Sequence, residues 1–233
     1  STQLPAIKCS MQLCRLITRQ MARCYGKLEW TLQLLQTQTL RTVSPAGGHR
    51  EMLVTVTGPA AEPVTSAEIK ASARIDGTEF DTQIAILITA FRQQAEHQQG
   101  RRLITQTVEL ILDAFPDEEE IDLLLPDAQS IMSIKYLDTA GTEQTLSGTV
   151  YALDVDSTPS RVLLKYGQQW PATQDVPNAV RVRYTVGYGA ASTDVPSNTR
   201  LWIIAQSCAA LDNQTPMPWI DRLLDAETVH RIA

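Results

Sequence analysis

The stretch from Glu62 to Pro116 constrains the fold of this chain most, because it encodes two helices and a strand with little loop between them. Thr65 and Glu68 have the Thr-x-x-Glu spacing of a capping box, in which each side chain accepts a hydrogen bond from the other residue's backbone amide. This pattern predicts a first helix over residues 65–75. The Asp76-Gly77 pair that follows is typical of a helix end.

A longer helix is predicted over residues 79–99, with Thr78 as its N-cap and Gly100 as the residue that ends it. Apolar residues recur at helical spacing along this segment and form one stripe. The stripe consists of Phe80, Ile84, Leu87, Ile88, Phe91 and Ala95. We therefore expect this helix to pack against a core along one side only.

Short strands are predicted to follow in close succession from residue 103 to residue 189. Their predicted ranges are 103–112, 121–125, 131–137, 143–146, 150–155, 161–164 and 180–188. The last range shows the clearest alternation, because valines and Tyr184 alternate with Arg181, Arg183 and Thr185. A sheet with one buried and one wet face is antiparallel, which predicts a small sandwich or barrel.

A third main helix is predicted over residues 196–211, with Pro196 at its first helical position. The predicted fold class is therefore α+β: a helical core of three main helices with an antiparallel β-sandwich-like insertion between the second and third helices. We expect this domain to span residues 52–213. A C-terminal tail over residues 214–233 follows a proline break and contains the apolar side chains Trp219, Ile220, Leu223 and Leu224.

Residues 1–51 differ from the rest in charge, with seven Lys or Arg against two Glu, a net charge of +5. Two interpretations of this leader stay open. Apolar residues recur every seven positions, which would suit a helix laid against a partner. They are Ile7, Cys14, Met21, Leu28 and Leu35. Alternatively, Met52 is the natural start and the leader is an upstream extension.

The remaining 182 residues carry 13 basic and 24 acidic residues, a net charge of −11. Such an acidic body argues against a groove that grips nucleic acid by neutralising phosphates. No apolar run approaches the roughly 20 residues that a membrane-spanning helix needs. The four cysteines and three histidines match no zinc-binding spacing. We therefore expect no membrane association, no metal and no cofactor.

The sequence holds no pattern typical of a catalytic nucleophile, a zinc protease or a nucleotide site, and we expect it not to be an enzyme. Two other classes remain as alternatives. A carboxylate-dependent hydrolase would need the acids between Asp117 and Asp122 to be buried in a cleft. A binding module for carbohydrate or protein would need exposed aromatic side chains on one face, for which Trp170, Tyr184 and Tyr188 are the candidates.

Several motifs occur in an order that resembles a known family. They are EPVTSAEIKASARI, a long helix, GRRLITQTVELILDAFP, a WPAT turn, NAVRVRYTVGYG and VPSNTRLWIIA. In this order they resemble the head-to-tail connector proteins of tailed bacteriophages and prophages, also called adaptor or head-completion proteins. The resemblance covers residues 59–212 and excludes the leader and the end of the tail.

The resemblance implies a structural virion protein at the head-tail junction, assembled in the host cytoplasm. Members of that family form rings, commonly of twelve copies, beneath the portal protein and present a docking surface to the next tail or stopper protein. DNA passes through such a ring without specific binding. By this resemblance the partners would be further copies of the chain, the portal, a tail or stopper protein and passing DNA.

Two sets of residues take roles under this resemblance. The tail residues Trp219, Ile220, Leu223 and Leu224 would dock on the portal, and truncation after Asn213 would abolish portal binding while leaving a folded monomer. The polar face of the long helix would meet a neighbour in the ring. That face consists of Gln83, Arg92, Gln93, Glu96 and Gln99.

Overall fold

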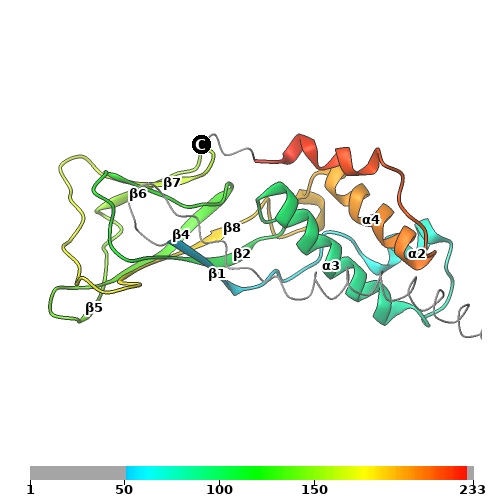
Figure 1. Cartoon of the computed structure of the whole chain (residues 1–233), viewed down its shortest axis with the longest axis horizontal. Coiled ribbons are helices and arrows are strands. Elements are labelled where there is room, and N and C mark those ends of the chain that lie inside the picture. Colours follow the sequence, from blue (N-terminus) through cyan, green and yellow to red (C-terminus); the bar gives the residue numbers. More distant parts are fainter. Residues whose placement is uncertain (1–50, 230–233) are drawn as a thin grey trace, which may run out of the picture. The chain divides into compact units, whose positions relative to one another are not determined.

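The computed structural model describes residues 51–229, which fold into α-helices, β-strands and short 3-10 helices (Figure 1). The predictions made for the leader lie outside the described residues, apart from Glu51, which is the first residue of a strand. The last four residues of the predicted tail also lie outside them.

The first described helix, α2 (Ser66–Ala73), begins at the predicted capping box. The Thr65 amide donates to the Glu68 carboxylate at 2.8 Å, and the Glu68 amide donates to the Thr65 hydroxyl at 3.3 Å. The helix ends slightly earlier than predicted, because Arg74 adopts a left-handed conformation with φ 55°. The capping prediction is therefore confirmed, and the end of the helix lies before Asp76-Gly77.

The long helix, α3 (Asp81–Gln99), begins two residues later than predicted. Its N-cap is Phe80, which makes no capping hydrogen bond, so the predicted cap at Thr78 is wrong. Thr78 instead begins a turn, in which its carbonyl accepts from the Asp81 amide at 3.2 Å. The Lys70 ammonium group binds the Gly77 carbonyl and the Asp81 carboxylate at the two ends of this turn. The predicted end is correct, since Gly100 has φ 68° and closes the helix.

The third helix, α4 (Ser197–Leu211), lies beside α3 and α2 (Figure 1). Pro196 is its N-cap, with a ψ of 137° that lies outside the helical region, so the prediction that it is the first helical residue is wrong. Trp202 and Ile203 of α4 are fully buried, and the Trp202 ring meets Phe91 edge-on at 6.0 Å. The helices share one apolar core, which we call the helical core. It contains Val64, Ile69, Ile84, Ile88, Ala95, Leu103, Ile104, Val195, Trp202, Ile203, Ile220 and Leu224.

The larger sheet has five strands in the order β1-β2-β8-β4-β5, all antiparallel. The strands are β1 (Glu51–Thr57), β2 (Gln106–Leu112), β8 (Val180–Val186), β4 (Ala128–Leu137) and β5 (Glu143–Thr145). Strand β1 comes before the helices and pairs with β2, so that Leu53 lies opposite Leu110. The sheet therefore includes β1, a strand that precedes the helices and lies outside the predicted insertion over residues 103–189.

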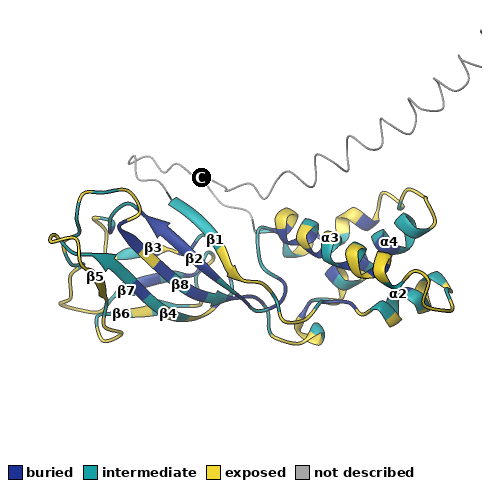
Figure 2. Cartoon of the chain, turned by 90° about the horizontal axis from the view of Figure 1, so that it is seen from below, coloured by how far each residue is buried: buried dark blue, intermediate teal, exposed yellow. Residues whose placement is uncertain are grey.

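The smaller sheet has three strands in the order β3-β7-β6. They are β3 (Glu120–Asp122), β7 (Arg161–Leu164) and β6 (Tyr151–Asp154). Buried residues of both sheets form one core, which we call the sheet core (Figure 2). Val162 of β7 and Ile121 of β3 belong to it together with Tyr184 of β8, whose hydroxyl donates to the Leu123 carbonyl.

Three 3-10 helices complete the described chain: η1 (Ser192–Asp194), η2 (Ile220–Leu223) and η3 (Asp225–Glu227). The first precedes α4. The other two belong to the tail, and η2 packs on α4.

We expect the capping box to contribute measurably to the free energy of unfolding. Replacing Thr65 by Ala removes the side-chain acceptor at the N-cap, and we expect the free energy of unfolding to fall by about 1 kcal/mol. Denaturant unfolding followed by far-UV circular dichroism measures this. The control is Ser72→Ala on the exposed side of the same helix, which should change stability by less than about 0.5 kcal/mol. Equal effects of the two variants would contradict the prediction.

We expect the contribution of Glu68 to stability to depend on pH. The hydrogen bond from the Thr65 amide, helped by the Thr65 hydroxyl and by Arg200, holds the pKa of Glu68 below its ordinary value of 4.5. A folded-state pKa that is lowered gives stability that is present above the unfolded pKa and lost as the pH falls through the folded pKa. The stability difference between the wild type and Glu68→Gln should therefore be largest above pH 4.5 and shrink in acid. A difference that is constant with pH would contradict this.

Candidate functional site: surfaces available for assembly

The polar face predicted on α3 divides into two groups in the structure. Gln83 and Gln93 are exposed. Arg92, Glu96 and Gln99 are buried, with exposed fractions of 6%, 4% and 0%. The three buried side chains are held within the chain, so only Gln83 and Gln93 remain available to a neighbour.

Glu96 is the centre of a buried ion network. Its carboxylate accepts hydrogen bonds from the Leu103 amide at 3.2 Å and from the Gln106 side chain at 2.7 Å. The guanidinium groups of Arg92 and Arg102 lie 3.3 and 3.5 Å from it. Arg92 also binds Glu62 at 2.8 Å. The network thereby joins α3 to the segment before α2 and to strand β2.

Burial raises the pKa of Glu96, and the opposing causes are the charges of Arg92 and Arg102 and the Leu103 amide. A buried carboxylate is costly unless charges and donors surround it, and here both are present. In the sequence these side chains belong to a helical polar stripe, and such a stripe cannot distinguish a solvent-exposed face from one that is covered by another segment. Their role is to hold the helices and the sheet together.

Gln99, the last residue of α3, performs a similar role one turn beyond Glu96. Its side-chain amide donates to the Thr199 hydroxyl at 3.0 Å, and its backbone carbonyl accepts from the Val229 amide at 3.0 Å. Thr199 lies in α4, and Val229 lies in the tail. Gln99 thus fastens both of these segments to α3.

The four predicted tail residues also separate into two groups. Ile220 and Leu224 are buried in the helical core with exposed fractions of 8% and 2%, and Leu223 packs partly buried against it. Trp219 is 53% exposed. Three of the four residues therefore fasten the tail to its own chain, and Trp219 faces outward.

The 3-10 geometry of η2 explains this separation. Side chains three residues apart share one side of such a helix. Trp219 and Arg222 therefore lie on the same side, and both are exposed, whereas Ile220 and Leu223 lie on the inner side. Met217 is 65% exposed, and its sulfur accepts from the Trp219 indole at 3.4 Å. We call Met217, Trp219 and Arg222 the tail patch.

Met217 and Arg222 were not predicted as site residues. The spacing of three between Trp219 and Arg222 could have indicated them, had a 3-10 turn been expected after the two prolines. The apolar composition of the tail instead favoured its treatment as one docking segment. Trp, Met and Arg are the residue types that protein interfaces favour.

Arg101 fastens the end of the tail to the segments just before β4 and just after β8. Its guanidinium lies 3.1 Å from Asp127, donates to the Tyr188 hydroxyl at 2.6 Å and lies over the Tyr188 ring. The Tyr188 hydroxyl donates to Glu227 of η3 at 3.0 Å. Burial is the main cause that raises the pKa of Tyr188, so the phenol stays protonated and remains a donor.

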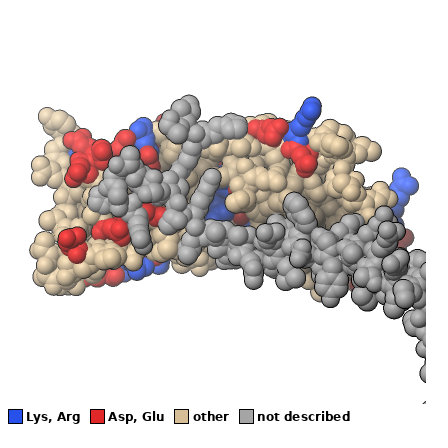
Figure 3. Space-filling model, viewed as in Figure 1, with Lys and Arg blue, Asp and Glu red and all other residues tan. Residues whose placement is uncertain are grey.

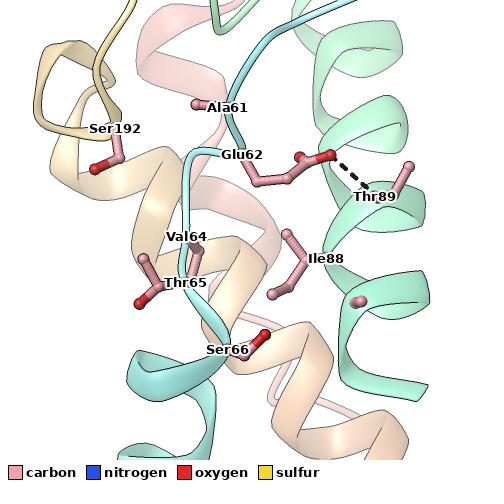
Figure 4. Close-up of a pocket in the computed structure, with 9 residues that line it drawn as sticks. Ala61, Glu62, Val64, Thr65, Ser66, Ile88, Thr89 and Ser192 are labelled. Carbon is pink, nitrogen blue, oxygen red and sulfur yellow. Dashed lines mark hydrogen bonds between the residues drawn. The ribbon is translucent and has the colours of Figure 1, made fainter. Parts of the chain in front are cut away.

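A shallow groove of about 420 Å³ lies between the segment before α2 and helix α3 (Figure 4). Val64 and Ile88 supply apolar lining, and Thr65, Ser66 and Ser192 supply hydroxyl groups. The Thr89 hydroxyl donates to Glu62 across it at 3.1 Å. This hydrogen bond connects the segment before α2 to helix α3.

The conditions set for the two alternative classes are not met. Tyr184 is fully buried, Tyr188 belongs to the Arg101 network, and the Trp170 ring stacks on Phe115 at 5.0 Å. These aromatic side chains form no exposed face. The acids expected to be buried in a hydrolase are instead on the surface. Asp117, Glu118, Glu119 and Asp122 are all exposed, and Glu120 is half-buried and lies 2.8 Å from Arg161.

Within residues 51–229, no group of three or more His, Cys, Asp or Glu side chains is placed to hold a metal ion. None of the helices in the same range has the length and apolar character needed to cross a membrane.

No protein-family model matches the chain, and no curated protein is detectably similar to it. Solved structures do share its fold. A chain in the neck of an empty gene transfer agent (GTA) particle computed with C6 symmetry has a TM-score of 0.68 and 18% identity. The match covers 78% of this chain and 97% of that chain.

Two further structures agree with this match. A chain in the virion of a native GTA particle gives a TM-score of 0.66 at 18% identity, covering 78% of this chain and 97% of that one. A chain in the neck of a native GTA particle computed with C12 symmetry gives 0.60 at 17% identity, covering 76% and 97%. At this level of identity the similarity establishes the fold.

The buried network predicts a large loss of stability on removing its centre. Glu96→Ala leaves the Leu103 amide and the Gln106 side chain without their acceptor and leaves Glu62 as the remaining partner of the buried Arg92, and we expect the free energy of unfolding to fall by about 3 kcal/mol. Urea unfolding measures this. Gln98→Ala, an exposed change in the same helix, should cost less than about 0.5 kcal/mol. A Glu96→Ala chain as stable as the control would refute the assigned role.

Proposed function

We propose that this chain is a structural neck protein of a phage-like particle, in which copies assemble into a ring that joins the DNA-filled head to the tail. The observation that carries the proposal is the shared fold with chains of GTA necks and virions, which extends over 97% of the first matched neck chain. A match over nearly a whole chain is more informative than a match to one small motif. A shared fold does not by itself establish a shared function. The surfaces of this chain must therefore also suit assembly into a ring.

The described surfaces suit assembly better than catalysis. The buried charged side chains serve to connect segments, as the networks of Glu96 and Arg101 do. Large apolar side chains remain exposed on several elements, among them Ile86 at 64%, Met132 at 58% and Trp219 at 53%. Single exposed apolar side chains occur on most protein surfaces, so we use Ile86 only together with Gln83 and Gln93, and Trp219 only together with Met217 and Arg222.

The proposed ring contains twelve copies. The resemblance to connector proteins implies this number. Of the GTA necks that contain a chain with this fold, one was computed with C12 symmetry and another with C6 symmetry, and twelve copies are compatible with both. In the ring, the outer side of α3 would meet a neighbouring copy through Gln83 and Gln93. Ile86 lies between them on the same side of the helix, because 83, 86 and 93 are three and seven residues apart.

The proposed ring lets DNA pass without holding it. Residues 51–229 contain 12 Lys or Arg and 25 Asp or Glu, a net charge of −13. A lumen formed by such a body would repel phosphates more than it attracts them. The proposed partners are the portal on the head side and a tail or stopper protein on the other.

Portal docking is proposed for the tail patch. Ile220, Leu223 and Leu224 stabilise the position of the tail, and Trp219 presents an aromatic anchor with Arg222 beside it. A fully buried aromatic anchor is the usual centre of an interface. The division of roles also changes the choice of experiment. Truncation after Asn213 would remove two residues of the helical core, so it does not separate docking from folding.

The full chain, mixed with the portal protein of the same particle, tests this function. Electron microscopy and mass measurement of the purified complex should reveal a ring of this chain seated on the portal. A chain that forms no ring, with or without the portal, would overturn the proposal.

Trp219→Ala separates docking from stability. Because Trp219 is half exposed, we expect its loss to weaken portal binding at least tenfold, which corresponds to about 1.4 kcal/mol or more. The melting temperature of the Trp219→Ala chain should change little. The matched variant Ile220→Ala should behave in the opposite way, since it removes a core side chain and lowers stability by about 2–5 kcal/mol. Surface plasmon resonance and thermal melts measure the two effects. Portal binding that is unchanged in Trp219→Ala would contradict the assignment.

A further inference from the structure

Three basic side chains lie next to one another on the outer side of the larger sheet. Arg181 and Arg183 alternate with buried valines along β8, so they point away from the sheet core. Lys135 of β4 lies directly opposite Arg181. The exposed fractions of the three side chains are 45% for Lys135, 46% for Arg181 and 43% for Arg183. We call these three residues the basic face.

The basic face keeps a net positive charge after its ion pairs with carboxylates of the same chain are counted. Glu109 is buried between the two arginines, 3.1 Å from Arg181 and 2.9 Å from Arg183, and Glu143 lies 2.7 Å from Lys135. Three cations therefore share two carboxylates. Like charges directly opposite each other on neighbouring strands are destabilising, and within the described residues Arg181 uses only one of its guanidinium nitrogens. The face can accept a further anionic partner.

Acidic side chains gather on the outer side of the smaller sheet and on the turn that leads into it. Asp117, Glu118, Glu119 and Asp122 are exposed, and within residues 51–229 none of them forms an ion pair. Asp122 flanks the buried Ile121 on β3, so it points away from the sheet core. Figure 3 shows acidic side chains gathered over the strands. We call these four residues the acidic face.

Asp122 and the basic face lie on opposite sides of the sheet core, because the inner sides of both sheets form that one core. The other three acids lie on the turn that leads into β3. A twofold pairing would place each face against its own copy and bring like charges together, which is unfavourable. Pairing the basic face of one copy with the acidic face of the next brings opposite charges together. Such a contact joins two different surfaces, and its repetition gives a closed ring or an open filament.

We propose that the basic face binds the acidic face of a second copy of this chain and so forms a contact between ring neighbours. This rests on the proposed function, and it names the residues that set the direction of the ring. Nucleic acid fits the basic face less well, since Glu109 and Glu143 lie among its cations and the rest of the body is acidic. Charges at the rim of a contact steer the encounter and set its register, and salt weakens them.

The experiment uses two full-length variants whose faces have inverted charge. In the first variant, Arg181→Glu and Arg183→Glu are combined with Glu109→Gln, so that no buried carboxylate is left beside the new ones. In the second variant, Asp117→Lys, Glu118→Lys and Glu119→Lys make the acidic face basic. Mass measurement by light scattering follows assembly in about 0.01 M salt, where the screening length is about 30 Å, and in about 1 M salt, where it is about 3 Å.

The wild type should assemble in low salt and dissociate in high salt. Each variant alone should lose assembly, because it brings like charges together at every contact. An equimolar mixture of the two should assemble again, since every contact between unlike variants pairs opposite charges. The control carries Asp76→Lys, Asp212→Lys and Asp225→Lys, three exposed acids of the helical region, and should assemble like the wild type.

Circular dichroism confirms that each variant is folded, and Lys135→Glu replaces the first variant if the triple change unfolds the sheet. A wild type that stays monomeric in low salt, variants that assemble alone, or a mixture of folded variants that stays monomeric would each overturn the proposal. Short duplex DNA that binds the wild type and not the first variant, with assembly unchanged, would identify nucleic acid as the partner instead. If rings still form on the portal in these cases, the proposed function stands and only this contact fails.

Discussion

The described structure depends on the buried charge of Glu96. One carboxylate on α3 binds the backbone of Leu103 and the side chain of Gln106, with Arg92 and Arg102 close by. Arg102 in turn reaches Thr55 of β1. An ionised group in a protein interior has to be surrounded by donors and opposite charge, because burial removes its water. That requirement fixes where α3 lies relative to β1 and β2, and the chain needs no long linker between its helices and its sheets.

Two separate apolar cores result from this arrangement, and each leaves different surfaces to solvent. The helical core includes two residues of the tail, so the exposed Trp219 is held on a fixed turn instead of a free end. The sheet core lies between two sheets, so polar and charged side chains of β3 and β8 necessarily point in opposite directions. A rigid aromatic anchor and two oppositely charged sides are suited to repeated assembly. Both follow from packing, and neither requires a binding cavity.

The polar stripe on α3 shows how pattern and packing differ. At the level of the sequence, Gln83, Arg92, Gln93, Glu96 and Gln99 are one hydrophilic surface. In the structure, the segment before α2, the start of β2 and the tail cover three of them. The spacing of apolar residues indicates which side of a helix prefers the core, but it contains no information about a second layer that covers the polar side. The same reason separates Ile220 from Trp219, which are neighbours in sequence.

The sequence by itself determined the capping box at Thr65, the end of α3 at Gly100 and the alternation along β8, because each depends on residues that are close in the chain. It also determined the ordered motifs that resemble connector proteins. Only the tertiary structure decided that β1 joins the sheet, that Arg92, Glu96 and Gln99 are internal, and that the tail is docked on α4. These outcomes depend on contacts between residues that are distant in sequence, whose energies no local pattern records.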